Sequence, residues 1–368
     1  VAVMLTGVMM PTDALGAPIT RGNGAQAEND GGIAIGDNTA SKGDYSISIG
    51  TNASVGRGDT DEGKTQSGIA IGQGATVTVD VAKGADVPAD QRTGGIAIGQ
   101  GATTKVVNAI AVGSGTSADG AQAVTIGHNS RSITNNSVAL GNETRVASLN
   151  GFALGNNARA GYDETNKLIG LPNDQAFGSN ARAYGGSSMA FGNDAKSSGG
   201  GAVSIGNGSQ SRGDWAVAIG NGSETAAAVA TPSATINGVT HNFAGTNPAS
   251  TVSVGKAGME RTVTNVAAGR ISATSTDVIN GSQLFAVKTE VEKGVSYAGD
   301  VKAAAAADNK FTHKLGEQTN VVGGVTDVTK LTDNNIGVVS NGTDTLNIKL
   351  AKTLTGLESV TAGNTKID

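Results

Sequence analysis

The residues of this chain that could carry out chemistry are few, and their densest group spans 57–65. Residues 58–65 have the Gly-x4-Gly-Lys-Thr spacing of a phosphate-binding loop, which should follow a buried strand and open a helix. Three carboxylates within this loop would repel a triphosphate. They also lack the glutamate that a calcium-binding EF-hand requires eleven residues after Asp59, where Ala70 stands. We therefore interpret the segment as a solvated acidic loop, and we predict no nucleotide, metal or other cofactor.

Other signatures of catalysis are also missing from the sequence. The chain has no cysteine, and its three histidines, His128, His241 and His313, lie far apart without the spacing of a metal site. No Gly-x-Ser-x-Gly nucleophile motif and no pair of acid–base carboxylates is evident. We therefore expect a protein that is not an enzyme.

The elements that position the remaining residues come from one short repeated motif. In this motif, two large apolar residues flank a small one, and a glycine follows. Residues 33–36 are the first of thirteen copies and residues 252–255 the last. Eight of the twelve intervals between closing glycines are 14 residues long, and the other four are longer. A fixed period broken only by additions indicates a stacked solenoid with loop insertions. We place the insertions at 51–71, 73–98, 156–177 and 221–254.

Within each copy, the alternation of large and small residues predicts a short strand with one large face and one small face. The middle position holds only Ala, Ser or Thr, which indicates close approach by another backbone or another subunit. We expect the large residues, such as Val138 and Leu140, to form the core, and the glycine to begin a turn at positive φ. Fourteen residues per coil give a thin roll that buries little surface alone, so we predict that parallel β-rolls associate.

The composition agrees with a solenoid of small residues. Glycine occurs 56 times in 368 residues and aromatic residues make up 3%, so a conventional core of large rings is excluded. The net charge is −5 and no basic cluster stands out, which argues against electrostatic capture of nucleic acid or of an anionic membrane.

Beyond the repeats, the sequence predicts a short helix and then strands. The helix, with Thr276 as its cap and Gly294 as its end, carries apolar residues at heptad-like spacing, namely Leu284, Val287 and Val291. The alternating residues 346–350 predict a strand, and Asn341-Gly342 predicts a turn before it. The first residues of the chain resemble the latter part of a secretory signal. We therefore divide the chain into a signal remnant, a repeat domain, a neck, a short coiled-coil linker and a β-rich connector, at 1–17, 18–255, 256–287, 288–295 and 296–368.

Three segments carry a resemblance to a known family. Residues 136–141, Asn-Ser-Val-Ala-Leu-Gly, resemble the head repeat of the YadA-like trimeric autotransporter adhesins, and residues 265–284 resemble the neck that follows such heads. Residues 296–368 are similar to the connector domains of these adhesins' stalks. The resemblance implies an all-β fold of left-handed parallel β-rolls in a homotrimer, followed by a neck, a short coiled coil and the connector. It also implies a passenger fragment of a bacterial cell-surface protein, without the C-terminal region that anchors the family in the outer membrane.

The resemblance implies a function as well. The family attaches, without catalysis, to host extracellular matrix such as a collagen-like protein, to host cell receptors or to other bacteria. Asn136 and Ser137 belong to the copy most similar to the family's matrix-binding motif, so they are candidate ligand-binding residues. We add Trp215, whose ring we expect to be half-exposed. Two rival functions stay open: a trimeric fibre of the phage type, and a polysaccharide-active β-solenoid, which would need acidic residues aligned on successive coils.

Two tripeptides match the sequence that integrins recognise. Arg212-Gly213-Asp214 falls on a glycine that recurs seven residues after several repeat glycines, so we interpret it as a turn. Arg57, Gly58 and Asp59 form the other tripeptide, which lies on an insertion, and we retain it as a candidate ligand-binding motif.

Overall fold

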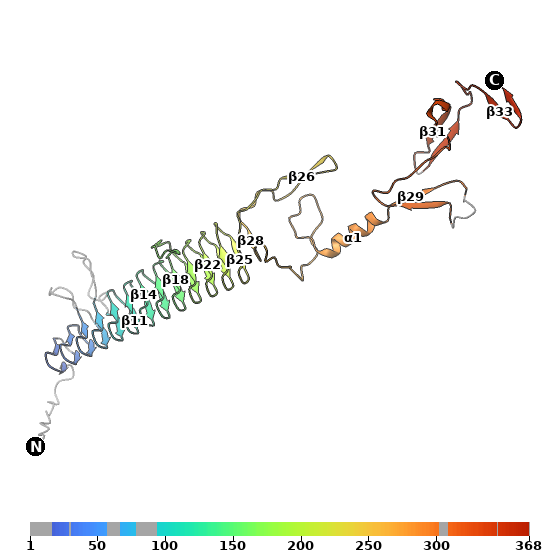
Figure 1. Ribbon diagram of the computed structural model, residues 1–368. Coiled ribbons are helices and arrows are strands. Elements are labelled where there is room, and N and C mark those ends of the chain that lie inside the picture. The colour runs from blue at the N-terminus through green and yellow to red at the C-terminus, as the bar shows by residue number, and fades with distance from the viewer. Residues whose placement is uncertain are drawn as a thin grey trace, which may run out of the picture. The chain divides into compact units, whose positions relative to one another are not determined.

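The computed structural model describes residues 17–28, 31–56, 67–78, 94–301, 308–343 and 345–367. The chain divides into two compact units. Unit 1 comprises Val1–Val266 and Ile271–Thr276, and unit 2 comprises Ala267–Arg270 and Asp277–Asp368. The described part of unit 1 is mainly a stack of coils, and that of unit 2 contains one helix and three hairpins (Figure 1).

Unit 1 is a parallel β-solenoid in which successive coils add strands to two sheets, called sheet A and sheet B here (Figure 1). In the described residues, sheet A has fourteen strands: β1 (Ile19–Arg21), β3 (Ile33–Ile35), β5 (Ile47–Ile49), β7 (Ile69–Ile71), β9 (Ile96–Ile98), β11 (Ile110–Val112), β13 (Val124–Ile126), β15 (Val138–Leu140), β17 (Phe152–Leu154), β19 (Gln175–Phe177), β21 (Met189–Phe191), β23 (Val203–Ile205), β25 (Val217–Ile219) and β28 (Val252–Ser253). Sheet B has twelve, each of two residues: β2 (Gln26–Ala27), β4 (Ala40–Ser41), β6 (Ser54–Val55), β8 (Thr76–Val77), β10 (Thr103–Thr104), β12 (Ser117–Ala118), β14 (Arg131–Ser132), β16 (Arg145–Val146), β18 (Arg159–Ala160), β20 (Arg182–Ala183), β22 (Lys196–Ser197) and β24 (Gln210–Ser211).

Neighbouring coils stack residue on residue, as the fixed period predicts. Val138 pairs with Phe152 in sheet A, and Arg145 pairs with Arg159 in sheet B, both in parallel register. One coil precedes the first that the sequence analysis counted, because β1 pairs in the same register with β3. Arg21 concealed this copy, since it stands where later coils have a large apolar residue.

The interior of the roll is made of small residues. The middle residue of a sheet A strand, such as Ala139 or Ala153, is fully buried in the single chain and packs in one cluster with sheet B residues such as Val146. The close approach is therefore made by the opposite strand of the same chain. The prediction that Val138 and Leu140 form the core is wrong for the single chain. Both residues are only partly buried, because they lie on the outer side of the strand.

The glycine that closes a sheet A strand lets the coils approach closely. Gly141 has a φ of +138°, and a Cβ built on it would lie 2.5 Å from the carbonyl oxygen of Gly155 in the next coil. Only glycine fits this backbone conformation and this spacing. At the end of the roll, the guanidinium of Arg261 takes the place of a further coil. A Cβ built on Gly220 would lie 3.3 Å from this guanidinium. The guanidinium also donates a hydrogen bond to the carbonyl oxygen of Asn221.

The insertions leave the roll at one kind of turn, which leads from sheet B to the next sheet A strand. Residues 161–174, named the third-insertion loop here, lie between β18 and β19. The fourth insertion precedes β28 and carries a hairpin of β26 (Ser233–Ile236) and β27 (Val239–Asn242), which turns at Asn237-Gly238 with positive φ. The first two insertions contain residues that lie outside the described ranges, 57–66 and 79–93.

Unit 2 contains helix α1 (Gly281–Glu292). Its N-cap is Asn280, so the prediction of Thr276 as the cap is wrong. The Asn280 side chain accepts a hydrogen bond from the backbone N–H of Gln283, and the Gln283 side chain accepts one from the backbone N–H of Asn280. This reciprocal capping box fixes where the helix begins. Its predicted end is confirmed, because Gly294 follows at a φ of +68°.

Three antiparallel hairpins and one 3-10 turn make up the rest of the described unit 2. The strand predicted at 346–350 is confirmed as β32. The elements are β29 (Val295–Ala298) paired with β30 (Lys310–His313), η2 (Val328–Lys330), β31 (Ile336–Ser340) paired with β32 (Leu346–Leu350), and β33 (Val360–Ala362) paired with β34 (Thr365–Ile367). Within the described ranges, no helix has the length and apolar character needed to cross a membrane.

Candidate binding surfaces of the roll

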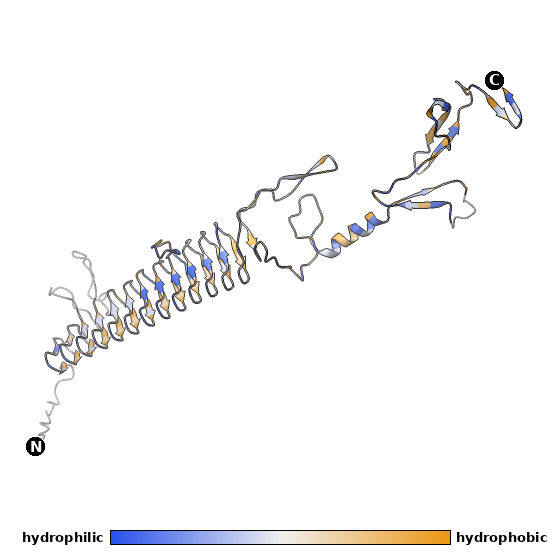
Figure 2. Cartoon of the chain, in the orientation of Figure 1, coloured by the Kyte–Doolittle hydropathy of each residue, from blue (hydrophilic) through white to orange (hydrophobic). Residues whose placement is uncertain are grey.

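The outer side of sheet A is apolar except at Arg21 and Gln175. The first and third residues of its strands form what we name the apolar face, and Figure 2 shows these strands largely in orange. The rings of Phe152, Phe177 and Phe191 follow one another along it, with centroid distances of 5.1 and 5.8 Å. Several large side chains of this face keep more than a third of their surface exposed in the single chain: Ile98, Ile126, Leu154, Phe191, Ile205 and Ile219.

The outer side of sheet B carries a row of cations that the sequence analysis missed. The first residues of five successive strands, β14 to β22, stack in register, and Figure 2 shows these strands in blue. The finding corrects the expectation that the chain has no basic cluster, because positions 14 or 23 residues apart in sequence become neighbours about 4.8 Å apart. In the sequence, the row is recognisable as a basic residue four positions after the repeat glycine in five successive coils. We name these residues the basic row: Arg131, Arg145, Arg159, Arg182 and Lys196.

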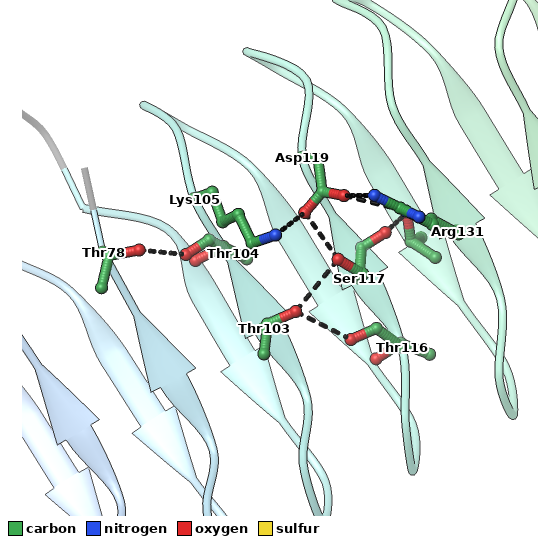
Figure 3. Close-up of polar contacts among 9 residues, drawn as sticks. Thr78, Thr103, Thr104, Lys105, Thr116, Ser117, Asp119 and Arg131 are labelled. Atoms are coloured by element: carbon green, nitrogen blue, oxygen red, sulfur yellow. Dashed lines mark hydrogen bonds and ion pairs between the residues drawn. The ribbon is translucent and has the colours of Figure 1, made fainter. Parts of the chain in front are cut away.

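One end of the basic row is held by Asp119 (Figure 3). Its carboxylate accepts from Arg131 at 2.7 and 2.9 Å and from the Ser117 hydroxyl at 2.6 Å, and it lies 3.4 Å from Nζ of Lys105. Thr103 extends the network by donating to Ser117. Burial opposes the ionisation of Asp119, but the hydrogen bonds and the two cations hold its pKa below the usual value.

The third-insertion loop covers the other end of the row. Nη1 of Arg182 donates to the carbonyl oxygen of Asp163 at 2.7 Å and to Oδ1 of Asn166 at 3.0 Å. Nζ of Lys196 lies 3.3 Å from the carboxylate of Glu164. The loop thus supplies partners for two of the five cations.

The middle of the row keeps its charge unbalanced. Neither Arg145 nor Arg159 forms an ion pair with any residue that the structure describes. Arg159 is 8% exposed, and it donates to Oδ1 of Asn157 at 2.6 Å while its Nε has no partner. Burial, and then the charges of Arg145 and Arg182, lower the pKa of Arg159. Two like charges at the strand spacing repel by about 1 kcal/mol in water, so the unbalanced middle of the row favours an anionic partner.

Arg131 and Arg145 border a shallow hollow of about 400 Å³. Its wall includes Ser117, Asn129 and Glu143. Glu143 makes no ion pair within the described ranges. The hollow therefore offers an anion two guanidinium groups and the side-chain amide of Asn129, and it holds one competing carboxylate.

Asn136 and Ser137, the two candidates from the repeat motif, lie in different surroundings. Asn136 is exposed at a turn with a φ of +55°. Its side-chain amide donates to Asn150, and Asn150 donates to Asn173, so the three form a ladder along the roll. Ser137 is fully buried, and its hydroxyl donates to the carbonyl of Thr134 at 2.5 Å. The structure therefore places Ser137 inside the roll, where it cannot contact a ligand, and leaves Asn136 on the surface.

Trp215 is 66% exposed and occupies a turn position with a φ of +56°. Its ring lies over Gly201 of the preceding coil, where an added Cβ would come within 3.0 Å of the ring. Tyr45 lies over Gly31 in the same way. Each ring covers a glycine at the edge of the roll and keeps its outer face free for a contact.

The two integrin-type tripeptides have different outcomes. Residues 57–59 lie outside the described residues. In the other tripeptide, Gly213 has a φ of +90° and Arg212 pairs with Glu224, which confirms a turn. Within the part of the chain that the structure describes, no group of three His, Cys, Asp or Glu side chains could hold a metal ion.

Comparisons with known proteins agree with this repeat geometry. The sequence profile described as the coiled stalk of trimeric autotransporter adhesin matches residues 262–307. The profile of the YadA head domain repeat matches residues 22–39, 27–53, 93–116, 107–130, 118–144, 135–158, 176–195 and 197–223. Together the two profiles cover just over half of the chain.

Individual relatives come from several bacteria. The autotransporter adhesin BtaE of Brucella suis biovar 1 (strain 1330) is 46% identical over 97 residues, which are 26% of this chain and 12% of BtaE. The C-terminal YadA-like domain of a Burkholderia pseudomallei protein is 52% identical over 26% of this chain and 46% of that one, with a TM-score of 0.26. The collagen-binding domain of the Yersinia adhesin YadA is 26% identical over 54% of this chain and 83% of that one, with a TM-score of 0.33. The chain thus spans a small part of BtaE and less than half of the Burkholderia domain. On its head repeats and its stalk segment, the chain belongs to the family of YadA-like trimeric autotransporter adhesins.

Proposed function

We propose that this chain forms the head, neck and first stalk segment of a bacterial surface adhesin, which works by multivalent binding and not by catalysis. The observation that carries the proposal is the apolar face of a roll built from the head repeat of this family. A surface of this kind requires further copies of the roll. Family membership supports three copies, which would present three identical sheet B surfaces to a ligand.

The apolar face lacks enough cover in a single chain. From β9 to β25, six of its large side chains are between 36% and 55% exposed. Complete burial of one such side chain contributes about 1.5–3 kcal/mol, so their uncovered parts correspond to roughly 4–8 kcal/mol per chain. Association of the rolls through sheet A would recover this energy.

Helix α1 gives an independent argument for the same assembly. Its apolar residues Leu284, Val287 and Val291 are 67%, 58% and 49% exposed. Their heptad-like spacing forms a stripe that a parallel coiled coil would bury. One symmetric assembly therefore satisfies the exposed apolar residues of the roll and of the helix.

For the ligand, we propose host extracellular matrix proteins, a host cell receptor or the surface of other bacteria. Asn136, Trp215 and residues 57–59 stand as candidate contacts. Contacts that are individually weak gain strength when one assembly presents them three times. Family membership supports a place at the bacterial cell surface, with an anchor in the outer membrane.

The rival of a polysaccharide-cleaving solenoid has less support. Hydrolysis of a glycosidic bond uses a pair of carboxylates that flank the bond. The stacked outer positions of sheet B from β14 to β22 hold cations instead. This surface is suited to holding an anionic ligand and not to cleaving a sugar chain.

A solid-phase assay with the purified full chain tests the proposal. The immobilised ligands are a panel of matrix proteins, cultured host cells and intact bacteria. We expect saturable binding to at least one of them, and a loss of at least tenfold when Leu154→Asp separates the rolls. A folded trimer that binds none of these surfaces would contradict the adhesive function. Trp215→Ala and Asn136→Ala, made in the trimer, test the two exposed candidates.

A further inference from the structure

We infer that the basic row is a binding site for a linear sulfated polysaccharide, which lies along the roll axis across successive coils. The inference rests on the proposed function in one respect. The apolar face must be the side that the trimer buries, so that sheet B stays outside.

The geometry of the row fits a linear polymer. Its five cations occupy one outer position on five adjacent parallel strands, so they repeat at the strand spacing of about 4.8 Å over about 19 Å. A small anion would contact one or two of these groups. A chain of regularly spaced anionic groups can follow the row from coil to coil.

The accessible part of the row lies at Arg131 and Arg145. The side chain of Arg131 is 52% exposed and forms an ion pair with Asp119. Arg145 is exposed and has no ion pair among the described residues. The hollow beside them provides room. At the far end, the third-insertion loop already occupies Arg182 and Lys196, so it sets a boundary for the ligand.

The residue types favour sulfate groups. Four of the five cations are arginines, whose planar guanidinium pairs with oxyanions through two parallel hydrogen bonds. Sites for single-stranded nucleic acid combine a basic groove with aromatic rings on which the bases stack. No aromatic residue lines the hollow as the structure describes it. A polysaccharide needs no such stacking, and Ser117 and Asn129 can hydrogen-bond to its hydroxyl groups.

The crowding of like charges supports the same ligand. Within the described ranges, the five cations have two carboxylates as ion-pair partners, Asp119 at one end and Glu164 at the other. Arg159 between them is buried, has an unpartnered Nε and adds its charge beside Arg145. A densely charged polyanion at Arg131 and Arg145 would relieve the repulsion in this part of the row, so binding should also stabilise the roll.

The test measures binding of heparin to the trimer of this chain at two salt concentrations. Arg131→Gln/Arg145→Gln should weaken binding by about 100-fold, since each charge-assisted contact corresponds to about tenfold in affinity. Lys42→Gln/Arg212→Gln is the matched control, because it removes two positive charges from the roll outside both the row and the apolar face, and it should change the affinity by less than about threefold. The wild type should also lose affinity as salt increases, more steeply than the row variant.

Two substitutions should act in the opposite direction, which a misfolded protein cannot imitate. Asp119→Asn removes the carboxylate that shares Arg131, and Glu143→Gln removes the carboxylate from the hollow. Each should strengthen heparin binding severalfold and leave the sedimentation of the trimer unchanged. If neither variant strengthens binding, the assignment of the site to this end of the row is overturned.

Further outcomes separate this inference from its alternatives. Equal losses in the two double variants would mean that only net charge matters, which overturns the site. Equal binding of desulfated heparin, or tighter binding of a single-stranded oligothymidine, would overturn the sulfated ligand. A trimer that binds matrix proteins but not heparin overturns this inference alone. A chain that sediments as a folded monomer overturns the proposed function, whatever it binds.

Discussion

Leu154→Asp is the substitution that best separates a lone roll from a trimer. Leu154 lies on the apolar face and is 44% exposed in the single chain. For a lone roll, the exchange removes the buried part of one side chain, which is about 1–2 kcal/mol. In a trimer it removes three fully buried leucines, about 5–9 kcal/mol, and it forces three carboxylates into an apolar interface at several kcal/mol each. The expected result is therefore dissociation.

Sedimentation velocity of the purified full chain gives the direct measurement, and circular dichroism during heating gives the stability. We expect the wild type to sediment as a trimer and the Leu154→Asp variant as a monomer or an unfolded chain. Gln210→Asp is the matched control, because it places the same acidic residue on the outer side of sheet B, where a trimer should tolerate it. A Leu154→Asp protein that stays trimeric with an unchanged melting temperature would refute burial of the apolar face.

Three further substitutions test the interior, the helix and one buried carboxylate. Ala153→Leu adds volume to the filled interior and should destabilise the roll by about 1–3 kcal/mol, seen as a lower melting temperature; an unchanged value would mean that the interior has spare room. Asn280→Ala removes the cap of α1 and should cost about 1 kcal/mol, with faster amide exchange in its first turn; unchanged exchange would contradict the capping box. Burial raises the pKa of Asp174 despite hydrogen bonds from Gly186 and Ser188, so its ionisation costs stability as pH rises from the unfolded pKa through the folded pKa. Asp174→Asn should therefore melt higher than the wild type at pH 7, with the difference disappearing near pH 3; a variant that melts lower at pH 7 would show that the charged form is needed.

The sequence predicted the stacking of the coils but not which side of each strand faces inward. The 14-residue period determines the register, because each added coil places equivalent residues side by side. Alternation defines two faces and leaves open which one is buried. Coil length decides this, since two strands of so short a coil lie too close together for large side chains. Ala139 therefore occupies the interior, and Val138 and Leu140 remain outside.

The basic row was missed because its residues are neighbours across sheet B and not along the sequence. Arg131 and Arg145 are 14 residues apart, and Glu143 lies between them in sequence. A search for consecutive basic residues therefore does not detect them. Grouping residues by their position after the repeat glycine would have revealed the row. The cap of α1 was also available from the sequence. Asn280 followed by Gln283 matches the spacing of a capping box, which should take precedence over an isolated threonine.

The thin interior also determines how assembly and recognition are divided between the two sheets. Since each strand buries small residues, almost every large or charged side chain must point outward. On sheet A these outward residues are apolar and suit contact with identical chains, whereas from β14 to β22 on sheet B they are cations and suit a ligand. Substitutions on sheet B should therefore change binding without changing assembly. Substitutions on sheet A should change both, because a multivalent surface depends on the trimer that displays it.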